Sequence, residues 1–183
     1  MLCHNDSKKL DVIGSTERIT VAGIKNVPAK IDTGADSSSI WASHIRVTKD
    51  GVLRFRLFGE GSPYYTGKDY ERTDFKVTVV RSSFGHEQIR YRTHLRTTLG
   101  GRTIRVLFNL SDRSNNNYPV LIGRRTISRK FIVDVSKNHT RIRSKSPKTK
   151  LAQKYLEKDP YKFHKKYVKN NTNGNIKLEQ KGE

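Results

Sequence analysis

Short segments rich in β-branched and aromatic residues follow one another through the first three quarters of this chain, with Gly or polar clusters between them. The segments are Arg18–Ala22, Val27–Ile31, Leu53–Phe58, Phe75–Val80, Gln88–Leu95, Arg102–Leu110, Val120–Ile122 and Phe131–Val135. Such segments are typical of strands. Because eight of them fall within about 136 residues with little helix between them, we predict an all-β barrel or sandwich.

Two of the separating clusters predict hairpin turns. Residues 82–86, with the sequence SSFGH, stand between two predicted strands and are interpreted as the tip of a hairpin. Gly100-Gly101 lies between two further strands and predicts a tighter, two-residue turn.

Positive charge is concentrated at the C-terminal end of the chain. The 183 residues carry 37 Lys and Arg against 17 Asp and Glu, a net charge of +20, and residues 137–183 hold half of this excess. Apolar residues are sparse there, so we place the end of the globular domain near Ser136–Lys145. We expect a basic, largely disordered tail over 137–183 with a short helix over Thr149–Glu157, and an N-terminal extension over residues 1–11.

This charge favours anionic partners. Aromatic residues alternate with lysines in the tail, a pattern that stacks on bases and neutralises phosphates, so contact with RNA or the ribosome is one interpretation and a solvated cationic extension is the other. No apolar run is long enough for a membrane span or a signal peptide, so we expect a cytoplasmic protein without a membrane partner. Cys3 is the single cysteine, which excludes an internal disulfide.

The candidate catalytic segment is the loop that contains Asp32. The sequence DTGAD (Asp32–Asp36) follows an apolar strand, and a second apolar strand, Tyr118–Ile122, ends in Gly123-Arg124. Asp-Thr-Gly by itself is an ordinary turn in which the Asp side chain caps the backbone. The two segments together, in this order and at this separation, favour a chemical role for the carboxylate.

These segments resemble the retropepsins, the one-lobed aspartic proteases of retroviruses. They are more similar still to a bacterial family of retropepsin-like proteins often labelled "ATP-dependent zinc protease". The similarity covers residues 12–136 and includes Val12–Gly14, Ala29–Ala35, Gly85–His86, Arg90–Tyr91, Leu110–Arg113, Tyr118–Arg124 and Phe131–Asp134. It implies a retropepsin-like closed β-barrel with one short helix and a flap hairpin, for which Phe75–His94 lies in the right place.

The resemblance also implies an aspartic endopeptidase that hydrolyses a peptide or protein substrate, with Asp32 as the catalytic residue. The mechanism needs two adjacent carboxylates that share one proton, because like charges in contact cannot both ionise. This chain contains one Asp-Thr-Gly. We therefore expect a homodimer in which Asp32 of each copy meets its symmetry mate.

The resemblance assigns a role to each neighbour of Asp32. Thr33 holds the two loops of the dimer in register, while Gly34 and Ala35 are small enough for the substrate backbone to approach. Asp36 binds the substrate backbone and forms a partly buried ion pair with Arg124.

The flap and its surroundings leave several roles open. The resemblance makes Phe84, Gly85 and His86 the tip that closes over the substrate, and an ordinary exposed hairpin tip is the alternative. Arg90 stands where a zincin helix needs its second His, and no Gly-rich phosphate loop is present, so no metal or cofactor is expected. Glu60–Thr73 has no counterpart in the retroviral enzymes and is interpreted as a surface loop, with a substrate groove as the alternative.

A second class of function fits the same sequence. The resemblance implies an association with ATP-grasp ligases that add glutamates to a ribosomal protein, and an acidic peptide suits a chain this basic. The alternative is therefore a non-catalytic peptide-binding or regulatory module of retropepsin fold that accompanies such a ligase. The complete DTGAD segment favours the endopeptidase, although fold resemblance alone does not fix function.

Overall fold

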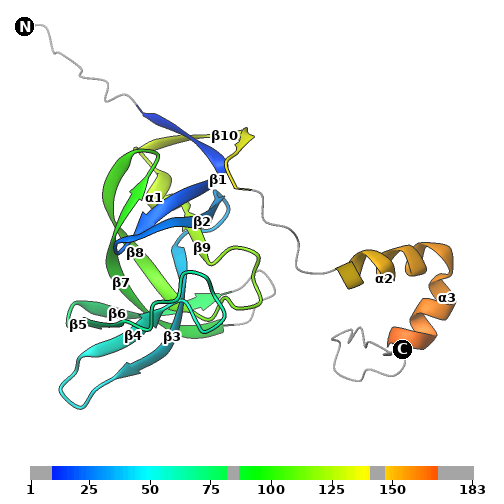
Figure 1. Cartoon of the computed structure of the whole chain (residues 1–183), viewed down its shortest axis with the longest axis horizontal. Coiled ribbons are helices and arrows are strands. Elements are labelled where there is room, and N and C mark those ends of the chain that lie inside the picture. Colours follow the sequence, from blue (N-terminus) through cyan, green and yellow to red (C-terminus); the bar gives the residue numbers. More distant parts are fainter. Residues whose placement is uncertain (1–9, 82–86, 141–146, 169–183) are drawn as a thin grey trace, which may run out of the picture. The chain divides into compact units, whose positions relative to one another are not determined.

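The computed structural model of the chain describes residues 10–81, 87–140 and 147–168 (Figure 1). Contacts within the chain divide it into two units, Met1–Ile142 and Arg143–Glu183. The described residues of the first unit form strands and one short helix, and those of the second form helices.

The first unit contains the expected strands and two more. Its elements are β1 (Asp11–Val21), β2 (Ile24–Asp32), β3 (Ser38–Val47), β4 (Leu53–Leu57), β5 (Asp69–Arg72), β6 (Phe75–Arg81), β7 (Glu87–Leu99), β8 (Arg102–Ser111), β9 (Val120–Gly123), α1 (Arg124–Ile127) and β10 (Phe131–Asn138). The two strands outside the predicted set are β3 and β5. The short helix α1 follows Gly123 directly.

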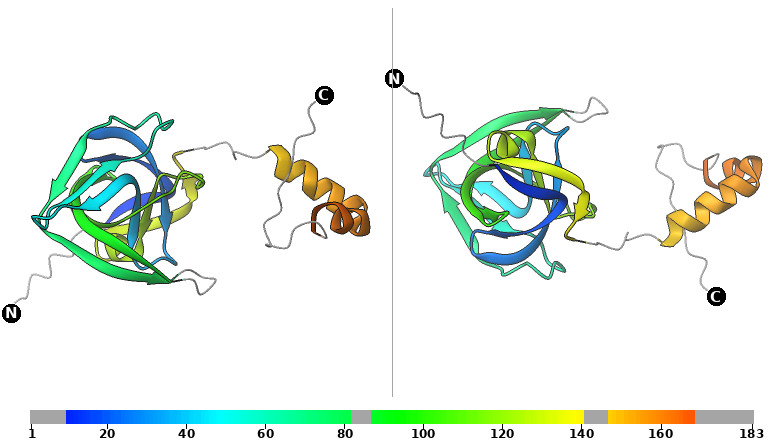
Figure 2. Two further views of the ribbon diagram at one scale, coloured as in Figure 1. Left: turned by 90° about the horizontal axis from the view of Figure 1, so that it is seen from below. Right: turned by 90° about the horizontal axis from the view of Figure 1, so that it is seen from above.

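Six of the strands close on themselves to form a barrel. The sheet order is β10-β1-β2-β9-β3-β8-β7-β6, and β1 pairs with β7 as well, so β1, β2, β9, β3, β8 and β7 make a ring. Both views of Figure 2 show these strands around a common interior. A closed ring has no unpaired strand edge. The predicted all-β barrel is therefore confirmed.

The core fills this ring with apolar side chains. Alternation along the barrel strands turns every second side chain inward. The largest fully buried side chains include Phe55, Phe58, Phe108, Ile13, Ile19, Ile40, Leu95, Leu99, Leu110 and Ile122. Ile31 and Ile122 are buried directly before Asp32 and Gly123, so the candidate loop begins where two core strands end.

The predicted flap hairpin is present as β6 and β7. These strands pair antiparallel from Phe75 opposite Thr93 to Arg81 opposite Glu87. The predicted tip residues Phe84, Gly85 and His86 lie outside the described residues.

The two-residue turn between β7 and β8 is also present. Leu99 pairs with Arg102 across the turn. Gly100 and Gly101 have φ angles of 54° and 78°, the left-handed conformation that a type I′ hairpin requires at both central positions.

The segment Glu60–Thr73 is more than the predicted surface loop, since part of it forms β5. β5 pairs with β4, which pairs with β3, and these strands lie together at the lower edge of Figure 1. Tyr70 is buried and stacks on Phe55 with ring centroids 5.6 Å apart. Two cross-strand ion pairs join β4 to β5: Arg54 with Glu71 at 2.8 Å and Arg56 with Asp69 at 2.9 Å.

The barrel unit continues beyond Ser136, within the range Ser136–Lys145 in which the sequence placed its end. The backbone N–H of Thr140 donates to Oγ1 of Thr16 at 3.0 Å. Nδ1 of His139 lies 2.8 Å from Oε1 of the buried Glu17. The segment up to Thr140 therefore completes the hydrogen bonding of β1.

The second unit contains more helix than the sequence predicted. The described residues form α2 (Pro147–Lys158), α3 (Pro160–Phe163) and a single π-helical turn, η1 (His164–Val168). The carboxylate of Asp159 caps α3 by accepting from the N–H of Lys162 at 2.9 Å, and Tyr155 packs on the buried Phe163. None of the helices in the described residues is long and apolar enough to cross a bilayer. Contact with RNA or the ribosome stays a prediction.

Candidate active site

Asp32 stands at the end of a pair of parallel strands. β2 and β9 pair in register from Ala29 opposite Val120 to Asp32 opposite Gly123. β9 pairs with β3 on its other side, so the loop of residues 33–37 connects β2 to β3 across the end of β9. This topology places the DTGAD loop directly over Gly123.

The Asp32 carboxylate is held by its own loop. Oδ1 accepts hydrogen bonds from the backbone N–H groups of Gly34 at 3.1 Å and Ala35 at 3.2 Å. Asp32 is half-buried, whereas Thr33 and Gly34 are exposed. The capping geometry of an ordinary Asp-Thr-Gly turn is therefore present, and it also fixes the direction in which the carboxylate points.

Gly123 allows the loop to lie this close to β9. A Cβ atom at this position would lie 2.5 Å from the carbonyl carbon of Ser37 and 2.8 Å from the carbonyl oxygen of Ala35. The neighbouring backbone uses the same proximity, because the N–H of Arg124 donates to the Ala35 carbonyl at 2.8 Å. In the sequence, Gly123 is recognisable only as the end of an apolar strand. No residue spacing indicates that the DTGAD loop lies against it.

Buried hydroxyl groups fix the start of β3 after the loop. Oγ of Ser38 accepts from the N–H of Gly123 at 3.1 Å and lies 2.8 Å from Oγ1 of Thr126. Oγ of Ser39 lies 2.8 Å from Oγ of Ser111. Sequence analysis missed these serines, because serine is usually exposed. The apolar pair Ile40-Trp41, which follows these serines, was the sequence signal for a buried strand at this position.

Arg124 contacts Asp36, and the two side chains form an ion pair. The side chains are 63% and 52% exposed, respectively, so this pair is more exposed in the single chain than the sequence analysis expected. The backbone supports the contact, since the N–H of Arg125 donates to the Asp36 carbonyl at 3.2 Å. Binding of a substrate backbone by Asp36 stays a prediction.

A further arginine, Arg113, lies near the loop, and Arg90 lies near Arg113. Burial lowers the pKa of Arg113, the charge of Arg90 lowers it further, and the charge of Asp32 raises it. Nε of Arg113 donates to the carbonyl of Tyr118 at 3.1 Å, which holds this side chain beside β9. Both arginines belong to segments of the family resemblance, which assigns them no role. The structure brings the Arg113 charge within range of the Asp32 carboxylate.

Other candidate groups lie elsewhere. Asp69 and Glu71 pair with arginines of β4. Among residues 10–81, 87–140 and 147–168, no three His, Cys, Asp or Glu side chains cluster as the ligands of a metal ion would. His94 lies on β7, and its pKa is lowered, first by burial and then by the charge of Arg105.

Comparison with known proteins identifies similar chains for the barrel unit. The model of the RimB-like family, described as retropepsin-like aspartic endopeptidase RimB, matches residues 12–144. Two curated relatives, from Shewanella pealeana and Shewanella halifaxensis, are each named "Probable alpha-L-glutamate ligase" and are 31% identical to this chain over 132 residues. The match covers 69% of this chain and 29% of each relative, so the chain spans less than a third of their length.

A solved structure gives the same picture of the fold. The crystal structure of Lpg0085, a protein of unknown function from Legionella pneumophila, is 27% identical to this chain with a TM-score of 0.52. The match covers 72% of this chain and 98% of the Legionella chain.

Proposed function

We propose that this chain, which belongs to the RimB-like family of retropepsin-like proteins, is an aspartic endopeptidase that acts as a homodimer. The observation that carries the proposal is the geometry of the Asp32 loop. Its carboxylate is oriented by two backbone N–H groups at the end of two core strands, while Thr33 and Gly34 beside it are exposed. The name of the matching family supports the same activity.

The second carboxylate of the proposed site comes from a second copy of the chain. Each chain contributes one Asp-Thr-Gly loop, and a two-fold axis beside the exposed Thr33 brings Asp32 of each copy together. The two carboxylates then share one proton. One of them accepts a proton from the attacking water while the other donates its proton to the carbonyl oxygen of the scissile bond.

The support beneath the loop suits this chemistry. A catalytic group has to be held within about 0.5 Å of its productive position. Gly123, Ser38 and the backbone of Arg124 provide contacts that fix the loop from below, and none of them depends on the substrate. We therefore expect the loop to be formed before substrate binds.

Replacement of Asp32 by Asn tests the proposal. The full chain and the Asp32→Asn variant are each incubated with a peptide library, and new termini are identified by mass spectrometry. Wild-type cleavage is expected to be greatest at mildly acid pH, where the pair holds one proton. The variant should lose at least about 100-fold in rate with unchanged circular dichroism and dimer formation, because an amide cannot share the proton. Asp50→Asn, in an exposed turn, is the matched control and should cleave as wild type does.

The outcomes separate this proposal from its alternative. Equal cleavage by wild type and the Asp32→Asn variant would assign the activity to other residues. Peptide binding without cleavage by the wild type would favour a non-catalytic module that accompanies a glutamate ligase. That alternative is supported by the names of the two Shewanella relatives, in which the similar region is part of a longer chain.

A further inference from the structure

The helices of the second unit carry a strong excess of positive charge. We call residues 147–168, which form α2, α3 and η1, the helical unit (Figure 1). Over residues 153–166 of this unit, the sequence has five lysines against one Glu and one Asp. All five lysines are exposed.

Both acidic side chains of this stretch are engaged within it. One carboxylate oxygen of Asp159 caps α3 by accepting from the N–H of Lys162, and the other lies 3.2 Å from Nζ of the same lysine. Oε1 of Glu157 accepts a hydrogen bond from the side-chain amide of Gln153 at 3.2 Å. The acidic groups therefore stabilise the helices and leave most of the lysine charge uncompensated.

Three lysines present this uncompensated charge to solvent. In the part of the chain that the structure describes, no carboxylate forms an ion pair with Lys154, Lys158 or Lys165. Lys154 and Lys158 are four residues apart on α2, so they share one helix face and lie about 6 Å apart along its axis. Like charges at this spacing repel each other. A polyanion bound along this face would relieve the repulsion.

The aromatic side chains of the helical unit differ in exposure. Phe163 is buried, and its ring centroid lies 6.4 Å from that of Tyr155. Nζ of Lys166 lies 5.5 Å from the centroid of the Tyr155 ring, so a cation–π contact joins η1 to α2. Tyr161, in contrast, is 75% exposed, and Lys165 follows it by four residues, about one helical turn.

These groups favour one class of polyanion. A helix that binds a membrane surface needs an exposed apolar face, whereas Phe163 is buried and Leu156 is half-buried in the helical unit. A single strand of nucleic acid offers phosphates to lysines and unstacked bases to an exposed aromatic ring. Tyr161, with Lys165 one turn away, supplies both kinds of contact.

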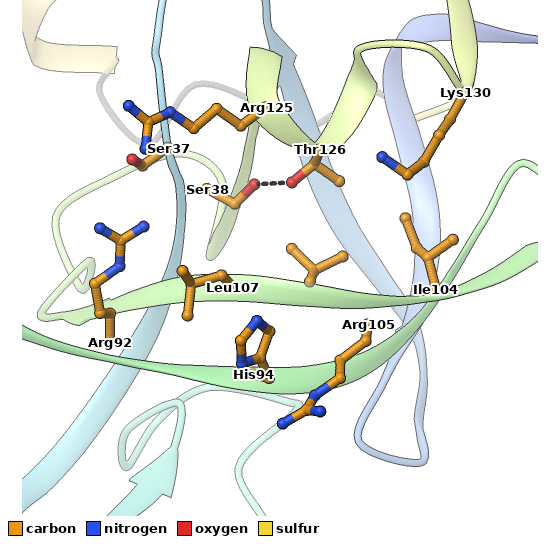
Figure 3. A pocket seen from close by; sticks show the side chains of 11 residues that line it. Ser37, Ser38, Arg92, His94, Ile104, Arg105, Leu107, Arg125, Thr126 and Lys130 are labelled. Carbon is orange, nitrogen blue, oxygen red and sulfur yellow. Dashed lines mark hydrogen bonds between the residues drawn. The ribbon is translucent and has the colours of Figure 1, made fainter. Parts of the chain in front are cut away.

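The barrel unit has a cationic surface of its own that lacks this combination. A pocket of about 190 Å³ lies between α1 and the strands β7 and β8, and Arg92, Arg125 and Lys130 are among the residues that line it (Figure 3). None of the described residues that line it is Phe, Tyr or Trp. A base therefore finds no Phe, Tyr or Trp ring to stack on in this pocket.

We infer that the helical unit binds single-stranded nucleic acid, with three lysines on phosphates and Tyr161 stacked on a base. The three lysines are Lys154, Lys158 and Lys165. Phosphate contacts set the affinity and its salt dependence, and stacking accepts any base, so sequence preference should be weak. This binding is independent of the peptidase chemistry proposed for Asp32, because no group of that loop takes part in it.

Fluorescence anisotropy of the full chain with short fluorescein-labelled strands of mixed sequence tests the phosphate contacts. RNA and DNA strands form separate arms, and the Kd is measured from about 50 to 200 mM NaCl. The variant Lys154→Gln, Lys158→Gln, Lys165→Gln loses three phosphate contacts. The slope of log affinity against log salt should therefore fall in magnitude by about 2, since each contact to a single strand contributes about 0.7.

Replacement of Tyr161 tests the stacking contact separately. Tyr161→Ala should weaken binding of the strand at least about fivefold, as expected for the loss of one stacked base. Tyr161→Phe keeps the ring and should bind as the wild type does. Inorganic polyphosphate, measured by competition, offers phosphates without bases and should bind the wild type and Tyr161→Ala equally. An equal loss for the strand and for polyphosphate would contradict stacking.

A matched control locates the binding on the helical unit. The variant Arg18→Gln, Lys25→Gln, Lys49→Gln removes the same charge from exposed positions of the barrel unit and should retain the wild-type salt slope. Circular dichroism of each variant checks that the helix and strand content is unchanged. An equal drop in slope for this control and the helical variant would overturn the inference, as would undiminished binding of the strand by Tyr161→Ala.

The two nucleic-acid arms identify the source of the phosphates. Tighter binding of RNA than of DNA would add a contact with the 2′-hydroxyl groups, and equal binding would assign the affinity to phosphates and bases alone. Either result supports the inference, provided that the Tyr161→Ala variant binds more weakly. Binding of phosphatidylserine vesicles without binding of either strand would refute it and assign the lysines to a membrane surface.

Discussion

Replacement of Gly123 by Ala should disrupt the site from below without touching any candidate catalytic group. The added Cβ would lie 2.5 Å from the carbonyl carbon of Ser37 and 2.6 Å from its oxygen. These are backbone atoms, so no side-chain rotation relieves the overlap. Ordinary contact begins at 3.4 Å, and the loop would have to move by roughly 0.9 Å.

The expected cost follows from the contacts at this position. Overpacking of this kind costs about 1–3 kcal/mol. Displacement of the loop also strains two hydrogen bonds, Gly123 N–H to Ser38 and Arg124 N–H to Ala35, each contributing about 1 kcal/mol. Alanine restricts the unfolded chain more than glycine does, which offsets about 0.4–1 kcal/mol. We expect a net loss of about 2–4 kcal/mol.

Urea unfolding measures this loss. The sequence contains a single tryptophan, Trp41 on β3, whose fluorescence reports on the barrel. The shift in the midpoint multiplied by the m-value gives the change in unfolding free energy. Gly34→Ala is the stability control, because its Cβ would meet only Oδ1 of Asp32 at 3.4 Å. Equal midpoints for the Gly123→Ala variant and the control would refute the packing argument.

Two further predictions concern the ion pair and the end of the barrel unit. In the single chain, a double-mutant cycle of Asp36→Asn and Arg124→Gln should give a coupling of about 0–1 kcal/mol, because both side chains are more than half exposed; a coupling above about 2 kcal/mol would contradict this. Truncation after Thr140 should leave the urea midpoint unchanged, whereas truncation after Ser136 should cost about 2 kcal/mol, because it removes the partners of the Thr16 and Glu17 side chains. Equal midpoints for the two truncated chains would count against the assigned end of the unit.

The strands that the sequence predicted are those whose burial follows from their residue types. Leu53–Leu57 and Val120–Gly123 are apolar on their inward faces, and pattern alone identifies them. β3 was missed as a full strand because it begins with two serines that are buried only through hydrogen bonds to distant hydroxyls. β5 was missed because its sequence, DYER, is mostly charged and its pairing is stabilised by cross-strand ion pairs with β4.

The candidate loop was identified from the sequence, but its surroundings were not. Asp32 and its neighbours form one continuous segment that a resemblance can match. Arg92 of β7 and Arg125 of α1 line one pocket, although no spacing in the chain brings these two residues together. The importance of Gly123 likewise depends on which backbone lies above it, and that is a property of the tertiary structure.

The pairing of β2 with β9 also has a consequence for biosynthesis. Asp32 is made early, but the residue opposite it in the sheet, Gly123, is made near the end of the barrel unit. Contacts between residues so far apart in sequence form late, because a long loop must close first. On the ribosome, the hairpin of β1 and β2 can form without β9, but the loop over β9 cannot. The loop that carries the Asp32 carboxylate therefore gains its contacts with Gly123 and Arg124 only when the barrel unit is almost fully synthesised.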